Sequence, residues 1–227
     1  MQNMEKNLNR VRARIVEAAR ACGRDPDSVL LLAVSKKKPA ADIRLAYRYG
    51  QRDFGENYLQ EAQQKMQELQ DLDIQWHFIG AIQSNKTRPI AEVFDWAHCV
   101  DRARIARRLS EQRPPGMQPL NVCIQVNLDQ EDSKAGVEPD DVPALAADNV
   151  NLPGIRLRGL MTIPAPRETE QQQRIPFARL AAMLSALRQQ GIDCDTLSMG
   201  MTQDLEAAVA EGATLVRIGT AIFGERN

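Results

Sequence analysis

The sequence has few of the residues that build metal centres and disulfide frameworks. Only two histidines and four cysteines occur among its 227 residues. The cysteines are scattered without a C-x-x-C pair, and neither histidine lies at metal-ligand spacing from a cysteine. We therefore interpret the cysteines as reduced core residues, and we expect neither a metal site nor a disulfide-stapled fold.

An excess of charge and long apolar runs are also missing. The chain has 29 basic and 30 acidic residues, so no overall basic field is available for nucleic acid or anionic membrane. No run approaches the ~20 apolar residues of a membrane span, and residues 1–6 lack the apolar core of a signal peptide. We expect a cytoplasmic protein that binds neither nucleic acid nor membrane.

The 43% of apolar residues suffices for a sizeable core, and it is arranged in short strands that alternate with helices. Glycines punctuate this alternation where helices end, as at Gly50, Gly191 and Gly212. The expected strands end near residues 36, 54, 79, 100, 126, 161, 198 and 218. The expected helices lie near 40–49, 56–70, 85–94, 102–112, 139–149, 171–190 and 202–211.

About eight strands, each followed by a helix or the chain end, favour a parallel sheet closed into a single (β/α)8 TIM barrel. An open doubly wound sheet is the alternative. No linker marks a domain boundary, so we expect one domain over residues 1–227. Residues 1–24 add an amphipathic helix packed on the barrel, although its apolar stripe could instead pair with another helix. Met4, Leu8, Val11, Ile15, Ala18 and Cys22 form that stripe.

The apolar run 30–34 continues into Lys36, which is expected on the same strand face as Leu32 and Val34. A lysine that ends a core strand is costly unless its amine is paired, neutral or covalently used. Lys38, expected on the same face, would favour the free amine of Lys36 that a Schiff base requires. The alternative is that the lysines of this stretch simply reach solvent.

The ends of the last two strands are typical of a phosphate-binding cradle. Glycine allows close backbone approach, hydroxyls can donate hydrogen bonds, and a helix expected to begin near Thr202 points its N–H groups at this position. In (β/α)8 barrels the loops after strands seven and eight are the usual phosphate site. With Lys36, the cradle predicts a phosphorylated aldehyde, either pyridoxal 5′-phosphate (PLP) or a sugar phosphate in a class I aldolase. Ser198, Gly200, Thr202, Gly219 and Thr220 form the expected cradle.

Arg217 lies inside the apolar run 215–218, where an unpaired guanidinium is expensive. PLP enzymes place either an acid or an arginine on the pyridine nitrogen, and an arginine makes the ring a weak electron sink. The alternative for Arg217 is a salt bridge to a carboxylate such as Glu206.

A series of short motifs extends along nearly the whole chain. They are Ala33-Val34-Ser35-Lys36, Phe54-Gly55-Glu56-Asn57-Tyr58, Trp76-His77-Phe78-Ile79-Gly80, Gln83-Ser84-Asn85-Lys86, Ser133-Lys134-Ala135-Gly136, Arg158-Gly159-Leu160-Met161, Leu197-Ser198-Met199-Gly200-Met201 and Val216–Gly224. Together these motifs closely resemble the YggS/PROSC family of pyridoxal phosphate homeostasis proteins. The resemblance implies a barrel like the N-terminal domain of alanine racemase (PLP fold type III), with PLP as a Schiff base on Lys36. It also implies that Arg217 faces the pyridine nitrogen and that Asn57 lies beside the cofactor. The implied phosphate contacts are Ser198, Gly200, Met201, Gly219 and Thr220.

Alanine racemases add a second, β-rich domain with a tyrosine acid/base, whereas this chain is expected to lack that domain. Its tyrosines, at 47, 49 and 58, lie near the first two strands. We therefore expect a PLP carrier and buffer without robust catalysis, a monomer or weak dimer that serves apo PLP-dependent enzymes transiently. A PLP-dependent racemase or lyase, a class I aldolase and a partner-binding module are the alternatives. Whether Lys38, Lys86 or Lys134 holds a second PLP stays open.

Overall fold

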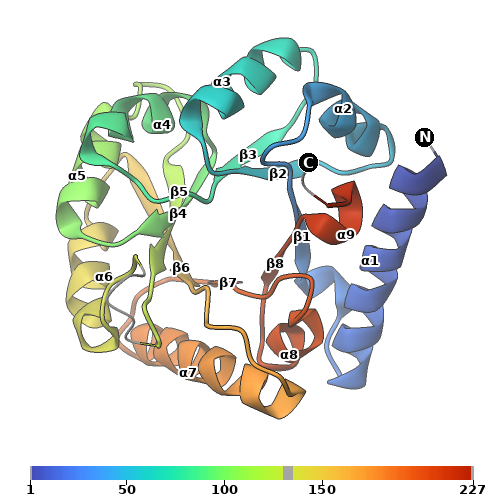
Figure 1. Cartoon of the computed structure of the whole chain (residues 1–227). Coiled ribbons are helices and arrows are strands. Elements are labelled where there is room, and N and C mark those ends of the chain that lie inside the picture. Colours follow the sequence, from blue (N-terminus) through green and yellow to red (C-terminus); the bar gives the residue numbers. More distant parts are fainter. Residues whose placement is uncertain (1, 130–134, 226–227) are drawn as a thin grey trace.

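The computed structural model describes residues 2–129 and 135–225. Its strands pair in parallel in sequence order, and β1 pairs with both β2 and β8, which closes the ring (Figure 1). The prediction of a (β/α)8 barrel rather than an open sheet is confirmed. The strands are β1 (Leu30–Val34), β2 (Asp53–Glu56), β3 (Gln75–Phe78), β4 (Trp96–Val100), β5 (Leu120–Gln125), β6 (Ile155–Met161), β7 (Thr196–Ser198) and β8 (Leu215–Ile218).

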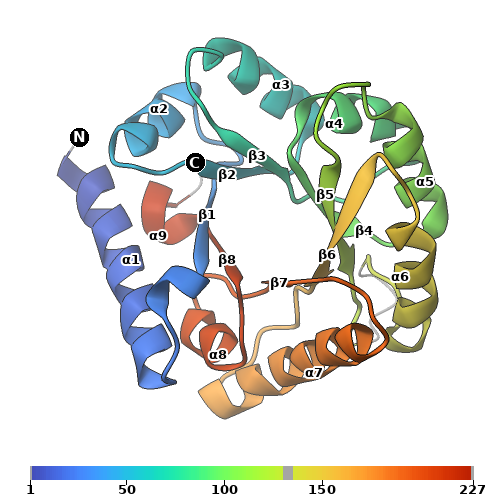
Figure 2. The same cartoon turned by 180° about the vertical axis from the view of Figure 1, so that it is seen from behind.

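Helices cover the outside of the ring, as both views along the barrel show (Figures 1 and 2). Two of them differ from expectation at the strand ends that matter for the site. The helix expected near Thr202 begins at Leu205, and a short helix after β8 was not expected. The helices are α1 (Gln2–Ala21), α2 (Ala40–Arg48), α3 (Leu59–Glu68), α4 (Thr87–Val93), α5 (Ala103–Gln112), α6 (Val142–Val150), α7 (Glu170–Gln189), α8 (Leu205–Ala210) and α9 (Thr220–Phe223).

Side chains alternate between the two faces of β1, as the period of a strand requires. Leu31 and Ala33 belong to the apolar core between strands and helices. Leu32 lies in the barrel interior, where a Cβ on Gly55 of β2 would approach it to 3.4 Å. Val34, two residues further along, lines the cavity described below. Lys36 therefore emerges from the inner face of the barrel.

Helix α1 lies along the outside of α8 and α9 (Figure 1). Five residues of its apolar stripe, from Met4 to Ala18, are buried, whereas Cys22 lies beyond the helix end and is exposed. The expectation of a buried cysteine is therefore wrong at this position. Arg14 of α1 pairs with Glu206 of α8 at 2.8 Å. The apolar stripe of α1 is therefore packed against the barrel of its own chain, and it is not available to form a coiled coil with another helix.

Candidate functional site

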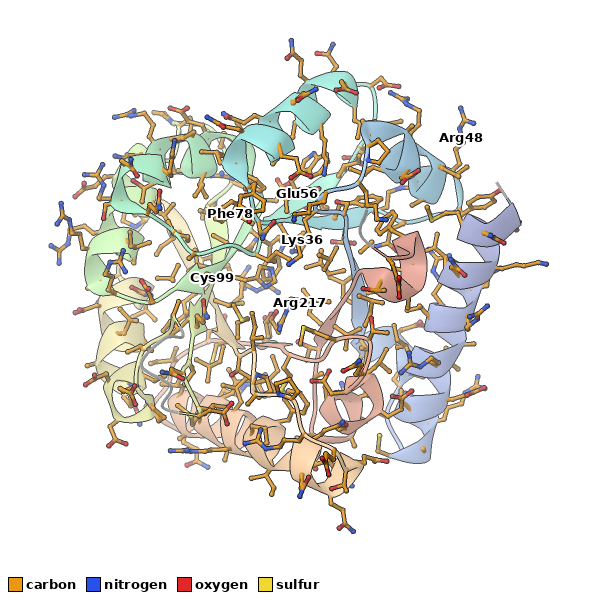
Figure 3. The ribbon with its side chains drawn as sticks, in the orientation of Figure 1. Lys36, Arg48, Glu56, Phe78, Cys99 and Arg217 are labelled. Carbon is orange, nitrogen blue, oxygen red and sulfur yellow. The ribbon has the colours of Figure 1, made fainter. Side chains whose placement is uncertain are left out.

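A cavity of about 360 Å³ opens at the carboxyl ends of the strands. That volume lies within the range of small-molecule sites, and this end of a barrel is where such sites form. Six of the residues expected at the site line it, namely Lys36, Met201, Thr202, Arg217, Gly219 and Thr220. Lys36 and Arg217 lie inside the ring, whereas Arg48 lies on its outer edge (Figure 3). The fold therefore brings an amine, a guanidinium and glycine-containing loops to one cavity.

Lys36 lies in a tight turn that follows β1 rather than on the strand itself. The backbone N–H of Lys38 donates to the carbonyl of Ser35 at 3.0 Å, and Lys37 adopts a left-handed backbone with φ of 61°. The amine of Lys38 is turned to the carbonyl of Glu225 at 2.7 Å. The expectation that Lys38 continues the strand face of Lys36 is therefore wrong, because the chain reverses between them.

Charged side chains beneath this turn hold it in place. The amine of Lys65 lies 2.7 Å from Glu56 Oε1, 2.6 Å from Glu61 Oε1 and 2.9 Å from the carbonyl oxygen of Ser35. Ser35 also donates its hydroxyl to Glu56 at 2.6 Å, and Glu61 accepts from the backbone N–H of Lys37. Burial raises the pKa of Glu56, while Lys65 acts in the opposite direction. This Glu56–Lys65 cluster positions Lys36 through both of its chain neighbours, and the sequence analysis missed it.

Arg217 is almost completely buried, with 5% of its surface exposed. Its Nη1 donates to the carbonyl and the hydroxyl of Ser198 at 2.6 and 2.8 Å, and its Nη2 donates to the carbonyl of Thr162 at 2.8 Å. Burial lowers the pKa of the guanidinium. The alternative of a salt bridge to Glu206 is wrong, because Glu206 faces outward and pairs with Arg14. These bonds occupy three of the five N–H groups of Arg217, and the side chain borders the cavity.

Three of the expected site residues lie behind the cavity wall rather than on it. Ser198 is fully buried, and its hydroxyl contacts His98 Nδ1 at 2.8 Å as well as Arg217. Gly200 has φ of +94°, and a Cβ on it would lie 2.6 Å from that of Ala208, so glycine is required there. The amide oxygen of Asn57 is buried without a hydrogen-bond partner among the described residues. Any ligand contacts of these residues stay a prediction.

The expected phosphate cradle has a different construction from the one inferred from the sequence. Thr202 and Gln203 line the cavity, but they belong to a turn that precedes α8. The carboxylate of Asp204 accepts from the backbone N–H of Met201 at 2.6 Å and so shapes this turn. Across the cavity, α9 begins at Thr220, directly after Gly219. The segments after both β7 and β8 therefore face the cavity, but the helix expected to begin near Thr202 begins at Leu205.

Both histidines lie inside the barrel in a chain of polar contacts. His77 Nδ1 lies 3.0 Å from His98 Nε2, and His77 Nε2 lies 3.1 Å from Asp53 Oδ1. Both imidazoles are fully buried. Sequence reasoning examined these histidines only as metal ligands, and no cluster of potential metal ligands occurs in residues 2–129 and 135–225. Their shared inward face on neighbouring strands was the signal that could have revealed them.

Burial of His98 predicts a measurable loss of stability in mild acid. Burial lowers its pKa well below the usual 6.5, and His77 and Arg217 act in the same direction. Since the unfolded chain regains the ordinary pKa, the stability contributed by neutral His98 is present above about pH 6.5 and falls by about 1.4 kcal/mol per pH unit below it. The free energy of unfolding can be measured with urea at a series of pH values between about 7 and 5. It should fall less steeply with decreasing pH for His98→Asn than for the unchanged protein. An equal pH dependence in the two proteins would contradict this assignment.

The lysines considered for a second PLP lie in different places. Lys38 contacts the carbonyl of Glu225, as described above. Lys86 ends a short turn before α4 and does not line the cavity. Lys134 lies outside the described residues. Of the two that the structure describes, neither Lys38 nor Lys86 lines the cavity that contains Lys36.

Sequence comparison places this barrel in a known group. The model of the alanine racemase N-terminal domain family matches residues 2–227, and the chain belongs to that family. Within it, the chain is 60% identical over 227 residues to the pyridoxal phosphate homeostasis protein of Pseudomonas aeruginosa, covering 100% of this chain and 97% of the relative. It is 51% identical to the protein of that name from Escherichia coli, covering 100% and 98%. The resemblance seen in the sequence motifs is confirmed.

Solved structures agree with this placement. PipY of Synechococcus elongatus, solved without PLP, superposes with a TM-score of 0.87 at 41% identity, covering 97% of this chain and all of PipY. The PLP-bound form of PipY gives 0.82 at 42% identity, covering 92% and 100%. An alanine racemase of Clostridium difficile gives 0.77 at 13% identity, covering 99% of this chain but 57% of the racemase. That likeness concerns the fold alone.

Proposed function

We propose that this protein binds PLP in the cavity at the carboxyl ends of the strands and takes part in PLP homeostasis. The observation that carries the proposal is the cavity shared by Lys36, which directly follows β1, and Arg217 of β8, the strand that pairs with β1 where the ring closes. Support comes from PipY, whose solved form with PLP shares this fold at 42% identity, and from relatives named for PLP homeostasis.

The residues present fit this cofactor. PLP supplies an aldehyde that condenses with an amine and releases water, and Lys36 brings an amine to the cavity. Gly219, Thr220, Met201 and Thr202 belong to the two segments that would hold the phosphate. Arg217 keeps N–H groups for a pyridine nitrogen, and a cation there keeps that nitrogen unprotonated. Asn57, with its unpartnered buried oxygen, would lie beside the ring.

We further propose a carrier rather than an enzyme. The described residues that line the cavity include no tyrosine, histidine or cysteine, and the carboxylate among them, that of Asp204, is engaged by the backbone N–H of Met201. Tyr58 is exposed, and Tyr47 and Tyr49 pack partly against the core outside the cavity. A racemase or lyase would turn over some amino acid in a reaction abolished by Lys36→Ala. A broad amino-acid panel should therefore give no such turnover.

The remaining expectations belong to the same proposal. The chain would act as one unit that hands PLP to apo-enzymes by transient contact, as a monomer or weak dimer, in the cytoplasm. Within the described parts of the chain, none of the helices combines the length and apolarity needed to cross a bilayer. The near balance of 29 basic and 30 acidic residues argues against nucleic acid as a partner.

Borohydride reduction of the PLP-loaded protein tests the proposal. We expect visible absorbance of a Schiff base before reduction and, after it, a stable pyridoxyl group on the peptide that contains Lys36. Lys38→Ala, a matched change two residues away, should retain both signals, whereas Lys36→Ala should lose both. A label on another lysine would contradict the assignment of Lys36. Trapping of a sugar phosphate without PLP absorbance would instead indicate a class I aldolase.

A further inference from the structure

A continuous line of polar side chains runs along the inside of the barrel and ends at Arg217. It leads from Asp53 at the start of β2 to His77 on β3, at 3.1 Å, and on to His98 on β4, at 3.0 Å. His98 contacts the hydroxyl of Ser198 on β7 at 2.8 Å, and that oxygen lies 2.8 Å from Arg217 on β8. We call these five residues the barrel relay.

The two ends of the barrel relay determine the direction of every hydrogen bond in it. Arg217 can only donate, so the oxygen of Ser198 accepts from it. Asp53, as a carboxylate, can only accept, so His77 carries its proton on Nε2 and presents a bare Nδ1 to His98. His98 therefore donates through Nε2, and its bare Nδ1 accepts the hydroxyl proton of Ser198. With both imidazoles neutral, this is the one arrangement in which all four bonds form.

The surroundings hold this arrangement in place. The ring of Trp96 stacks on His77 with 5.3 Å between centroids and 8° between planes. Arg158, paired with Asp195 at 2.7 Å, lies over the ring of Trp96 at 4.8 Å from its centroid. Of the barrel relay only Asp53 retains clear exposure, with 17% of its side chain accessible. The barrel relay thus reaches solvent at the end of the barrel opposite the cavity.

We propose that His98 and His77 are positioning residues for Arg217, acting through Ser198. The Ser198 proton is directed to His98, so this hydroxyl supports the guanidinium from behind and is not a donor to the phosphate. Fixed in this way, Arg217 presents its remaining N–H groups to the cavity in one orientation. The consequence for PLP rests on the proposed function, whereas the direction of the barrel relay does not.

The protein without PLP tests the direction of the barrel relay. Nitrogen-15 NMR of histidine-labelled protein separates imidazole nitrogens that carry a proton from those that do not. At about pH 8, well above the ordinary histidine pKa, we expect both histidines to be protonated on Nε2 and bare on Nδ1. Asp53→Ala should broaden or shift the His98 signals as well as those of His77. A proton on Nδ1 of either histidine in the unchanged protein would overturn the proposal.

PLP-loaded variants test the positioning role. His98→Phe removes the acceptor for the Ser198 hydroxyl. We expect about tenfold weaker PLP binding, because a hydrogen bond that orients a charged group is lost. We also expect a shift in the pH dependence of the cofactor absorbance. His98→Asn, whose side-chain oxygen replaces Nδ1, should restore most of both. Cys99→Ala, a truncation of the next buried residue of β4, should change neither. Equal spectra and affinity in His98→Phe and Cys99→Ala would overturn the proposal.

Two variants of Asp53 distinguish a failure of the barrel relay from a failure of the proposed function. Asp53→Asn keeps an acceptor for His77 at a partly exposed position, so its PLP affinity and cofactor spectrum should lie closer to those of the unchanged protein than those of Asp53→Ala do. Asp53→Ala should alter the cofactor spectrum in the same direction as His98→Phe but less. No spectral change in Asp53→Ala would limit the positioning role to His98 and contradict the relay. Failure of the unchanged protein to bind PLP would contradict the proposed function, while the NMR result would still decide the relay.

Discussion

Replacing Lys65 with methionine is expected to lower the free energy of unfolding by about 3–5 kcal/mol, which corresponds to about 10 °C in the thermal midpoint of a chain this long. The amine of Lys65 is the cation closest to the fully buried carboxylate of Glu56, at 2.7 Å. Without it, Glu56 is a buried charge that keeps the hydrogen bond from Ser35 but has lost its paired cation. Thermal and urea unfolding of both proteins measure the difference.

Two comparisons show whether the buried pair is the cause. Lys6→Met makes the same substitution on the exposed face of α1 and should stay within about 0.5 kcal/mol of the unchanged protein. Replacing Glu56 and Lys65 together by methionine should recover much of the loss, because no unpaired charge is left. A cost below about 1 kcal/mol for Lys65→Met alone would show that the carboxylate finds another partner or becomes protonated without penalty.

The same substitution should also weaken covalent PLP binding. Lys65 donates to the carbonyl of Ser35, and Glu61, its second partner, accepts from Lys37. Both contacts flank Lys36, so the turn that presents its amine loses the first of them and also the cation that holds Glu61 in place for the second. Borohydride trapping on Lys36 in protein that is still folded at low temperature separates this local effect from global unfolding.

Replacing Gly159 with alanine is expected to cost more than about 4 kcal/mol or to prevent folding. Gly159 of β6 pairs with Thr196 of β7, and an added Cβ would lie 1.9 Å from the backbone oxygen of Thr196. The backbones of β6 and β7 cannot move apart without breaking the hydrogen bonds between these two strands, which keep the barrel closed. Ser198, two residues further along β7, would be displaced with it, so the support of Arg217 is lost as well.

Gly191→Ala provides the matched control for Gly159→Ala. Gly191 has φ of +83°, but nothing lies within 4 Å of the Cβ that alanine would add. Its cost is therefore backbone strain alone, about 1 kcal/mol. Urea unfolding of the two variants separates strain from collision. A cost for Gly159→Ala no greater than that for Gly191→Ala would contradict the close approach of β6 and β7.

Sequence reasoning was most successful where local patterns decide structure. The apolar run of β1, closed by charge, predicted both a buried strand and a lysine emerging from its inner face. It failed two residues later, because the reversal at Lys37 depends on Glu61 and Lys65, which belong to α3. Helix α9 was missed because four residues carry too little periodicity to be recognised.

The residues around Arg217 show the same limit. Its burial was foreseeable from the run 215–218, but its partners were not. His98 and Ser198, which lie behind it, are 100 residues apart in the chain. No spacing rule relates two strands at that separation, because their distance is set by closure of the barrel. The carboxylate considered as its partner from the sequence, Glu206, lies on α8 and pairs with Arg14 of α1 instead.

The sequence by itself therefore determined the alternation of strands and helices, the parallel barrel and the position of Lys36 at the carboxyl end of the first strand, because each follows from side-chain periodicity within a few neighbouring residues. Only the tertiary structure decided which groups hold Lys36 and Arg217 in place and in which direction their hydrogen bonds run. Those bonds join strands that become neighbours only when the ring closes, and inside it every buried donor must find an acceptor wherever the closed sheet provides one.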